Sequence, residues 1–184
     1  MIKRICLGLV CLSSAAVVQA EPGNAFVTIA LGSAEQELTI DNRGSDSDSN
    51  TAIGIRGGYL FNFDQFFVGP ELSYSNNSDF TTDLTIAELG SESVNLGFKA
   101  GYHVIPQKLA VVARAGVSFW EVTSDSDFGN FEKSGEDAYY GLGVEYQLVE
   151  NLVLGASYTA LEFDVFDSVE YEITTPEVYF EVRF

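Results

Sequence analysis

The chain has 184 residues, of which 46% are hydrophobic and 13% aromatic, and it carries 27 acidic against 9 basic residues for a net charge of −18. So few basic residues cannot form a patch that neutralises phosphates, which excludes a nucleic-acid partner. The apolar and aromatic content predicts a folded chain despite the charge.

Residues 1–20 have the pattern of a secretory signal peptide. Lys3 and Arg4 precede an apolar run, and Val18 and Ala20 occupy the positions that a signal peptidase reads. We expect cleavage after Ala20, which leaves a single domain over residues 21–184. Both cysteines of the sequence lie in the leader, so we expect that domain to fold without a disulfide, at a net charge of −20 once two basic residues are lost.

After residue 20, apolar and polar residues alternate with a period of two, as they do in β-strands. Val94 and Leu96 fall on one face of their segment, for example, whereas Asn95 and Lys99 fall on the other. No apolar run in this part of the chain is long enough for a membrane helix. In chain order, the predicted strands are 25–32, 51–61, 66–74, 94–102, 109–119, 138–146, 152–160 and 175–184.

The connections between these segments alternate in length. Short turns are predicted at 62–65, 103–108 and 147–151, and long loops at 33–50, 75–91, 121–137 and 161–174. This alternation is typical of membrane barrels, whose short turns are periplasmic. The predicted fold is therefore all-β: an eight-stranded antiparallel up-and-down transmembrane β-barrel with short periplasmic turns and long acidic extracellular loops. Its last strand would pair with its first and leave no sheet edge.

The two faces of the predicted strands differ in chemistry. The apolar face carries ten aromatic residues in two groups, as expected for two bilayer interfaces: Tyr59, Phe61, Phe66, Tyr102, Tyr146 and Phe184, then Tyr74, Phe119, Tyr140 and Tyr158. A Lys or Arg facing lipid would cost about 2–4 kcal/mol, and the charges within the strands avoid that face. We expect a lumen charge network of Arg56, Glu71, Lys99, Arg114 and Glu145, with Glu177, Glu181 and Arg183 at the periplasmic mouth.

The four predicted loops hold 19 of the 27 acidic residues, with only Arg43 and Lys133 as bases. Such a surface attracts divalent cations diffusely. The stretch DSDSN at 46–50 resembles the start of an EF-hand loop, but Thr51 and Gly57 stand where the motif needs Gly and Glu. We therefore expect no specific metal site and no cofactor. The lone histidine, His103, has no catalytic partners nearby in sequence, so we expect no enzyme.

Several stretches together resemble a known family. GGYLFN, GPELSY, NLGFKAGYHV, ARAGVSFWEV and GLGVEYQLVENLVLGASY are similar to the transmembrane domain of outer-membrane protein A and related small eight-stranded barrels. The resemblance places Glu71, Lys99, Arg114 and Glu145 in a salt-bridged plug. The family also has an inward arginine on its seventh strand, which 152–160 lacks, and Arg56 is the candidate replacement.

The resemblance implies a monomer in the outer membrane of a Gram-negative bacterium, in contact with lipid and lipopolysaccharide. Val178, Phe180, Val182 and Phe184 resemble the carboxyl-terminal signal read by the barrel-assembly machinery. The expected function is membrane integrity with a plugged lumen, and surface contacts through the acidic loops. The alternatives are a narrow gated channel for ions or small solutes, a lipid-modifying enzyme, and a soluble lipocalin-type barrel.

Overall fold

A computed structural model describes residues 24–40, 44–82, 87–125, 131–166 and 169–184 of the chain. The expected signal peptide, residues 1–20, lies outside these residues. In the part that the structure describes, no helix is long and apolar enough to cross a membrane.

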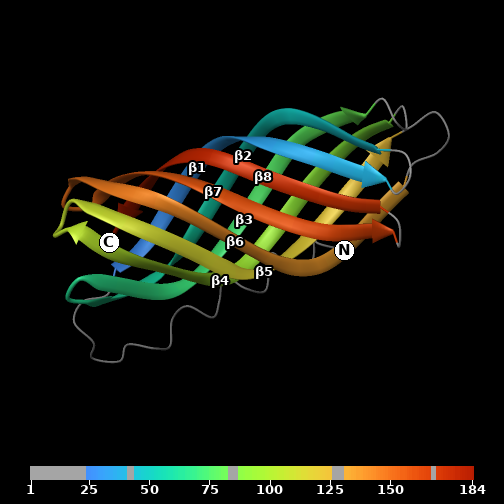
Figure 1. Cartoon of the computed structure of the whole chain (residues 1–184). Helices are drawn as coiled ribbons and strands as arrows, with labels where there is room; N and C mark the ends of the chain where they lie inside the picture. The colour runs from blue at the N-terminus through green and yellow to red at the C-terminus, as the bar shows by residue number, and fades with distance from the viewer. Residues whose placement is uncertain (1–23, 41–43, 83–86, 126–130, 167–168) are drawn as a thin grey trace.

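Eight strands form a closed barrel in which every strand pairs antiparallel with its neighbours in sequence (Figure 1). The predicted eight-stranded antiparallel up-and-down β-barrel is thus confirmed. The strands are β1 (Asn24–Ile40), β2 (Gly44–Phe63), β3 (Phe66–Thr82), β4 (Ala87–Ile105), β5 (Leu109–Asp125), β6 (Phe131–Val149), β7 (Leu152–Phe166) and β8 (Val169–Arg183).

The barrel closes between β1 and β8, as the sequence predicts. Ile29 lies opposite Phe180 and Phe26 opposite Arg183 in this pair. The hydrogen bonding reaches the last residue, because the Phe184 N–H donates to the Ala25 carbonyl at 2.8 Å. Both edges of the sheet are therefore satisfied.

The predicted long loops are wrong for most of their residues, which lie in strands. Residues 33–40 and 44–50, for example, extend β1 and β2 as one hairpin, paired as far as Ile40 opposite Gly44. The stretch 46–50, considered above as a cation loop, belongs to β2. The sequence missed these extensions because a polar hairpin needs no apolar face once its strands have left the membrane.

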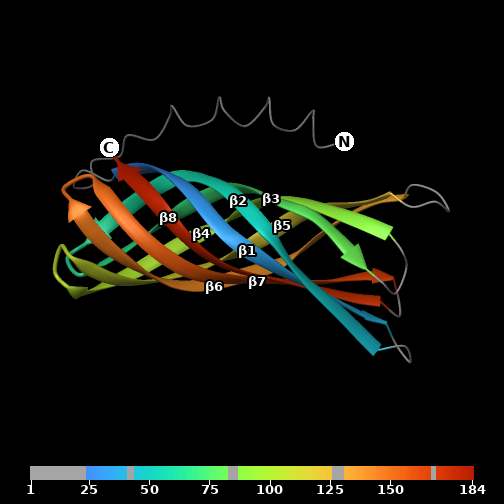
Figure 2. The same cartoon turned by 90° about the horizontal axis from the view of Figure 1, so that it is seen from above.

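The extensions separate into two lobes. Pairing between β2 and β3 stops at Ala52 opposite Asn77, and pairing between β6 and β7 stops at Tyr139 opposite Leu161. The other six strand pairs continue beyond these levels. One lobe therefore consists of the ends of β7, β8, β1 and β2, and the other of the ends of β3 to β6. Figure 2 shows the two groups diverging at the end opposite the short turns.

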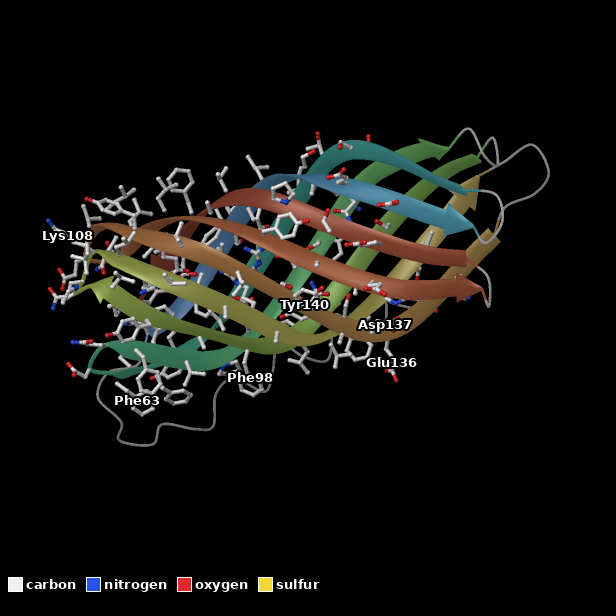
Figure 3. The ribbon with its side chains drawn as sticks, viewed as in Figure 1. Phe63, Phe98, Lys108, Glu136, Asp137 and Tyr140 are labelled. Carbon is white, nitrogen blue, oxygen red and sulfur yellow. The ribbon has the colours of Figure 1, made fainter. Side chains whose placement is uncertain are left out.

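The outer face of the barrel is apolar and the interior is polar. Ile29, Phe98 and Leu142 are 60%, 63% and 66% exposed, whereas Lys99 and Glu181 are 0% exposed. All ten aromatic residues predicted for the interfacial groups are exposed on the outer face. Figure 3 shows Phe63 and Phe98 projecting away from the barrel. This distribution suits a barrel surrounded by lipid and is the reverse of the lipocalin-type alternative.

Glycines on the inner face make room for large aromatic side chains. Phe26 lies opposite Gly58, Phe67 opposite Gly101, Trp120 opposite Gly135, and Tyr179 opposite Gly155. A Cβ at any of these four glycines would come within 3 Å of the ring of its partner. The pairing lets four rings lie flat against the wall of a narrow barrel, so that they fill the lumen without blocking strand pairing.

Candidate functional site in the barrel lumen

Lys99, on β4, is the centre of a buried charge cluster. Its Nζ lies 2.6 Å from Glu145 Oε1 on β6 and 2.6 Å from Glu181 Oε2 on β8. The ammonium group also lies 4.8 Å from the centroid of the Phe26 ring and 5.8 Å from that of Phe67. Two carboxylates and two aromatic faces thus surround a cation that has no contact with solvent.

Two arginines complete the cluster. Arg183 places Nη2 at 2.6 Å from Glu145 Oε2 and Nε at 2.8 Å from Glu181 Oε1. Arg114 places Nε at 3.2 Å from Glu71 Oε1, and its Nη2 lies 3.8 Å from Glu145 Oε1. We call Glu71, Lys99, Arg114, Glu145, Glu181 and Arg183 the lumen charge cluster. Its three cations balance its three carboxylates, so no net charge is buried there.

Two neutral hydroxyls anchor the carboxylates of this cluster. The Thr28 hydroxyl donates to Glu181 Oε2, and the Tyr179 hydroxyl donates to Glu145 Oε1, both at 2.9 Å. An apolar group, buried on the same inner face, packs beside the cluster and consists of Phe26, Leu60, Phe67, Ala110 and Val112. Lys99, Glu145 and Glu181 each have several partners and are held in one arrangement, because leaving any of them unpaired would be costly.

A second ion pair lies outside the cluster. Arg56 Nη2 on β2 donates to both carboxylate oxygens of Glu177 on β8, and the Ser157 hydroxyl donates to Glu177 as well. Tyr179 separates this pair from the cluster, since its ring centroid lies 5.6 Å from Arg56 Cζ and 5.0 Å from Arg114 Cζ.

The structure changes the predicted grouping of the charges. Glu71, Lys99, Arg114 and Glu145 do lie together, but Arg56 pairs with Glu177 instead of joining them. Glu181 and Arg183, expected as a separate group at the mouth, belong to the cluster. Position along a strand does not give height in the lumen, because the strands of a barrel are tilted and staggered. Arg183 thereby supplies a cation that β7 lacks.

Sequence reasoning missed two of the neutral partners, Thr28 and Ser157. Both fall on the inward parity of their strands, which is the signal that could have identified them. Trp120 lies inside the barrel and donates from Nε1 to Asp137 Oδ2 at 2.7 Å. His103 is near the end of β4, with its ring centroid 5.4 Å from that of Phe67.

Among the described residues, no group of three or more His, Cys, Asp or Glu residues could hold a metal ion.

A polar cavity of about 60 Å³ lies on the lobe side of the cluster, and we call it the lobe cavity. Its lining includes Arg56, Arg114 and Trp120, together with residues of both strand pairs at which the lobes separate: Ala52, Asn77, Tyr139 and Leu161. Part of its wall is fixed by amide–hydroxyl hydrogen bonds, from Asn95 to Ser73 and from Asn77 to Ser91, both 3.0 Å long.

Val178 and Phe180 of the predicted carboxyl-terminal signal are 59% and 57% exposed on the outer face, and the terminal Phe184 is 74% exposed. Val182, between them, is partly exposed. The four side chains therefore occupy alternate positions along the end of the chain, where β8 pairs with β1. All four lie on the outer face of the barrel, toward the region that lipid would occupy.

The sequence matches the model of one protein family, described as the outer membrane protein beta-barrel domain, over residues 5–184. No curated protein matches the chain.

Solved structures of low sequence identity share the fold. Neisserial surface protein A has a TM-score of 0.64 at 16% identity, covering 89% of this chain and 100% of its own. Ail of Yersinia pestis, in complex with the heparin analogue sucrose octasulfate, has a TM-score of 0.55 at 17% identity, covering 85% and 98%. OprG from Pseudomonas aeruginosa has a TM-score of 0.55 at 15% identity, covering 91% and 99%.

Proposed function

The chain belongs to the family of outer membrane protein β-barrel domains, and from that premise we propose that it is a closed barrel that supports membrane integrity and presents acidic lobes for surface contacts. Its location is the outer membrane of a Gram-negative bacterium. The proposal is of a structural and contact-forming protein and not of an enzyme.

The lumen charge cluster is the observation that carries the proposed closure. Lys99 reaches from β4 to carboxylates on β6 and β8, and Arg114 reaches from β5 to Glu71 on β3. Five of the eight strands thus contribute charged groups to one set of contacts. An eight-stranded barrel is narrow enough for side chains to fill it, and here oppositely charged groups that pair with one another fill part of it.

The energetics of buried charge favour a permanent plug. Opening a path through the cluster would separate Lys99, which is 0% exposed, from Glu145 and Glu181. Breaking a buried pair by removing one partner costs about 3–5 kcal/mol. A lumen held by several such contacts would open rarely, so a wide diffusion pore is not part of the proposal.

The acidic lobes support the proposed surface role. In sequence, the segments that form them hold most of the acidic residues of the chain, and the ends of β2, β3, β6 and β7 have no partner across the separation between the lobes. Carboxylates of this density attract divalent cations, which would bridge them to the phosphates of lipopolysaccharide. Ail binds a sulfated sugar analogue, whereas the negative charge of these lobes would repel such a polyanion.

The same family membership implies insertion by the barrel-assembly machinery. We propose that Val178, Phe180, Val182 and Phe184 are the signal that it reads, because they form an exposed apolar face at the carboxyl terminus. Phe184 follows the last strand residue, Arg183, and is 74% exposed, so its ring is accessible to a protein that reads this end of the chain.

The second candidate function is a narrow gated channel, and the position of Arg114 favours it. Arg114 lies 3.2 Å from Glu71 and 3.8 Å from Glu145, so a small movement would exchange its partner. Such an exchange could open a water path beside Tyr179.

Conductance in planar lipid bilayers separates the two functions. If the barrel is closed, the wild-type protein gives no steady current, and the charge-neutral double variant Lys99→Ala/Glu181→Ala gives one because it removes two side chains from the plug. The matched control is Glu136→Gln, at an exposed position outside the cluster. Frequent wild-type openings that disappear in Arg114→Met would establish the channel and contradict the permanent plug.

A further inference from the structure

Several buried polar atoms around the lobe cavity have no hydrogen-bond partner among the described residues. They are Arg56 Nη1, Arg114 Nη1 and Nη2, Tyr139 OH, Thr159 Oγ1 and Asn95 Oδ1, and the five residues that carry these six atoms line the cavity. Arg56, Arg114, Tyr139 and Asn95 are more than nine-tenths buried. A buried polar group without a partner is costly, so these atoms require a partner from outside the protein.

The chemistry of these atoms selects a negatively charged partner. Five of the six can donate, and three of those five belong to guanidinium groups. The two carboxylates in the lining already accept hydrogen bonds: Glu92 from Asn76, and Glu177 from Arg56 and Ser157. A cation would therefore find Asn95 Oδ1 as the one free amide oxygen of the set, whereas an anion would find several unused N–H and O–H groups.

The geometry also brings the two guanidinium groups to one place. Arg56 and Arg114 both lie against the Tyr179 ring, at 5.6 and 5.0 Å from its centroid. Each uses one side of its fork for a glutamate, so that the other side is directed away from that partner. Forked guanidinium donors match the oxygens of carboxylates and phosphates better than they match a spherical ion.

The size of the cavity limits the ligand. A single water needs roughly 10–15 Å³ by the same measure, and the cavity measures about 60 Å³. It has room for a ligand of a few non-hydrogen atoms, and it lies beneath the separation between the lobes, where the wall strands are no longer paired.

We propose that the lobe cavity binds a small oxyanion, either a short carboxylate or inorganic phosphate, between Arg56, Arg114 and Tyr139. The site adjoins the lumen charge cluster through Arg114, and it is tested by titration, whereas the proposed closure is tested by conductance, so either can fail without the other.

The sequence supplies its own probe, because its single tryptophan, Trp120, lines the cavity. We would titrate the purified protein in detergent micelles with sodium acetate and with sodium phosphate, replacing sodium chloride at constant ionic strength, and record Trp120 fluorescence. We expect a saturable change with at least one of the two oxyanions. Tyr139→Phe should weaken the apparent affinity by roughly tenfold, because it removes a hydrogen bond to a charged ligand.

Two further variants test the location. The double variant Arg56→Gln/Glu177→Gln removes an ion pair without leaving a lone charge and should abolish the saturable change. Ser118→Ala is the matched control, since the Ser118 hydroxyl is also buried and without a hydrogen-bond partner but does not line the cavity. Its titration should match that of the wild type. A heat-dependent gel-mobility shift checks that each variant is folded. If Tyr139→Phe does not fold, Thr159→Val is used in its place.

Three results would overturn the proposal. Without a saturable response to acetate or phosphate, the cavity holds water alone. In a further titration, sodium chloride would replace sodium fluoride at constant ionic strength. A fluorescence response to chloride equal to that with acetate or phosphate would show that the cavity does not select oxyanions. A response that persists unchanged in Tyr139→Phe and in the Arg56→Gln/Glu177→Gln variant would place the binding elsewhere.

Discussion

Lys99 Nζ and Glu181 Oε2 lie 2.6 Å apart inside the barrel although 82 residues separate them in sequence. Neither residue has any exposed surface. The contact joins the fourth strand to the last, so it forms only when β8 has closed on β1. The cluster around this pair therefore depends on complete closure of the barrel.

Replacing Lys99 should destabilise the barrel strongly. Lys99→Gln leaves Glu145 and Glu181 without their shared cation, and we expect a loss of about 3–5 kcal/mol in the free energy of unfolding. Urea titration in micelles, followed by Trp120 fluorescence, measures it. Lys108→Gln makes the same chemical change at an exposed turn residue, and its effect should stay within about 0.5 kcal/mol. Equal effects of the two variants would contradict the structural role of Lys99.

Removing the Thr28 hydroxyl should have a smaller effect. Thr28→Val keeps the shape of the side chain but loses the hydrogen bond to Glu181 Oε2. A hydrogen bond to a charged group contributes about 1.5–3 kcal/mol. In the background of Glu181→Gln the same change should cost less, so the two variants should be non-additive in the same urea titration. Full additivity would show that the contact contributes nothing.

Gly155 should tolerate no side chain. A Cβ at this position would lie 2.1 Å from Tyr179 Cζ, so Gly155→Ala should displace the ring from Glu145 and cost about 1–3 kcal/mol. Gly57→Ala is the control, because its nearest contact would be a carbonyl oxygen at 3.5 Å. A thermal gel-shift assay that gives the two variants the same midpoint would contradict the role assigned to the glycine–aromatic pairing.

The terminal aromatic should matter for assembly more than for the folded barrel. Phe184→Ala should reduce the amount of folded protein in the outer membrane of cells, while protein refolded in detergent keeps its unfolding midpoint. Phe98→Ala, which removes another exposed aromatic ring at 63% exposure, should leave the cellular level closer to that of the wild type. If the two variants accumulate equally, the signal assigned to the carboxyl terminus is absent.

The alternation in the sequence determined the fold, the strand count and the inward face of charges such as Lys99 and Arg114, because the side chains of a strand point alternately to its two sides. It also placed Phe180 and Phe184 outward on the closing strand, as the structure has them. The same signal could not locate the outer ends of the strands. The polar ends of β1 and β2, residues 33–40 and 44–50, continue their pairing without an apolar face, so their composition is that of a loop.

The tertiary structure alone decided which charges meet. Arg56 and Arg114 share the inward parity, yet one pairs with Glu177 and the other with Glu71. Arg183, the last residue of β8, takes a central place beside Glu145. The partner of each charge depends on the tilt and stagger of closed strands, which set height in the lumen. Those quantities arise only when all eight strands are paired, so no local pattern in the sequence encodes them.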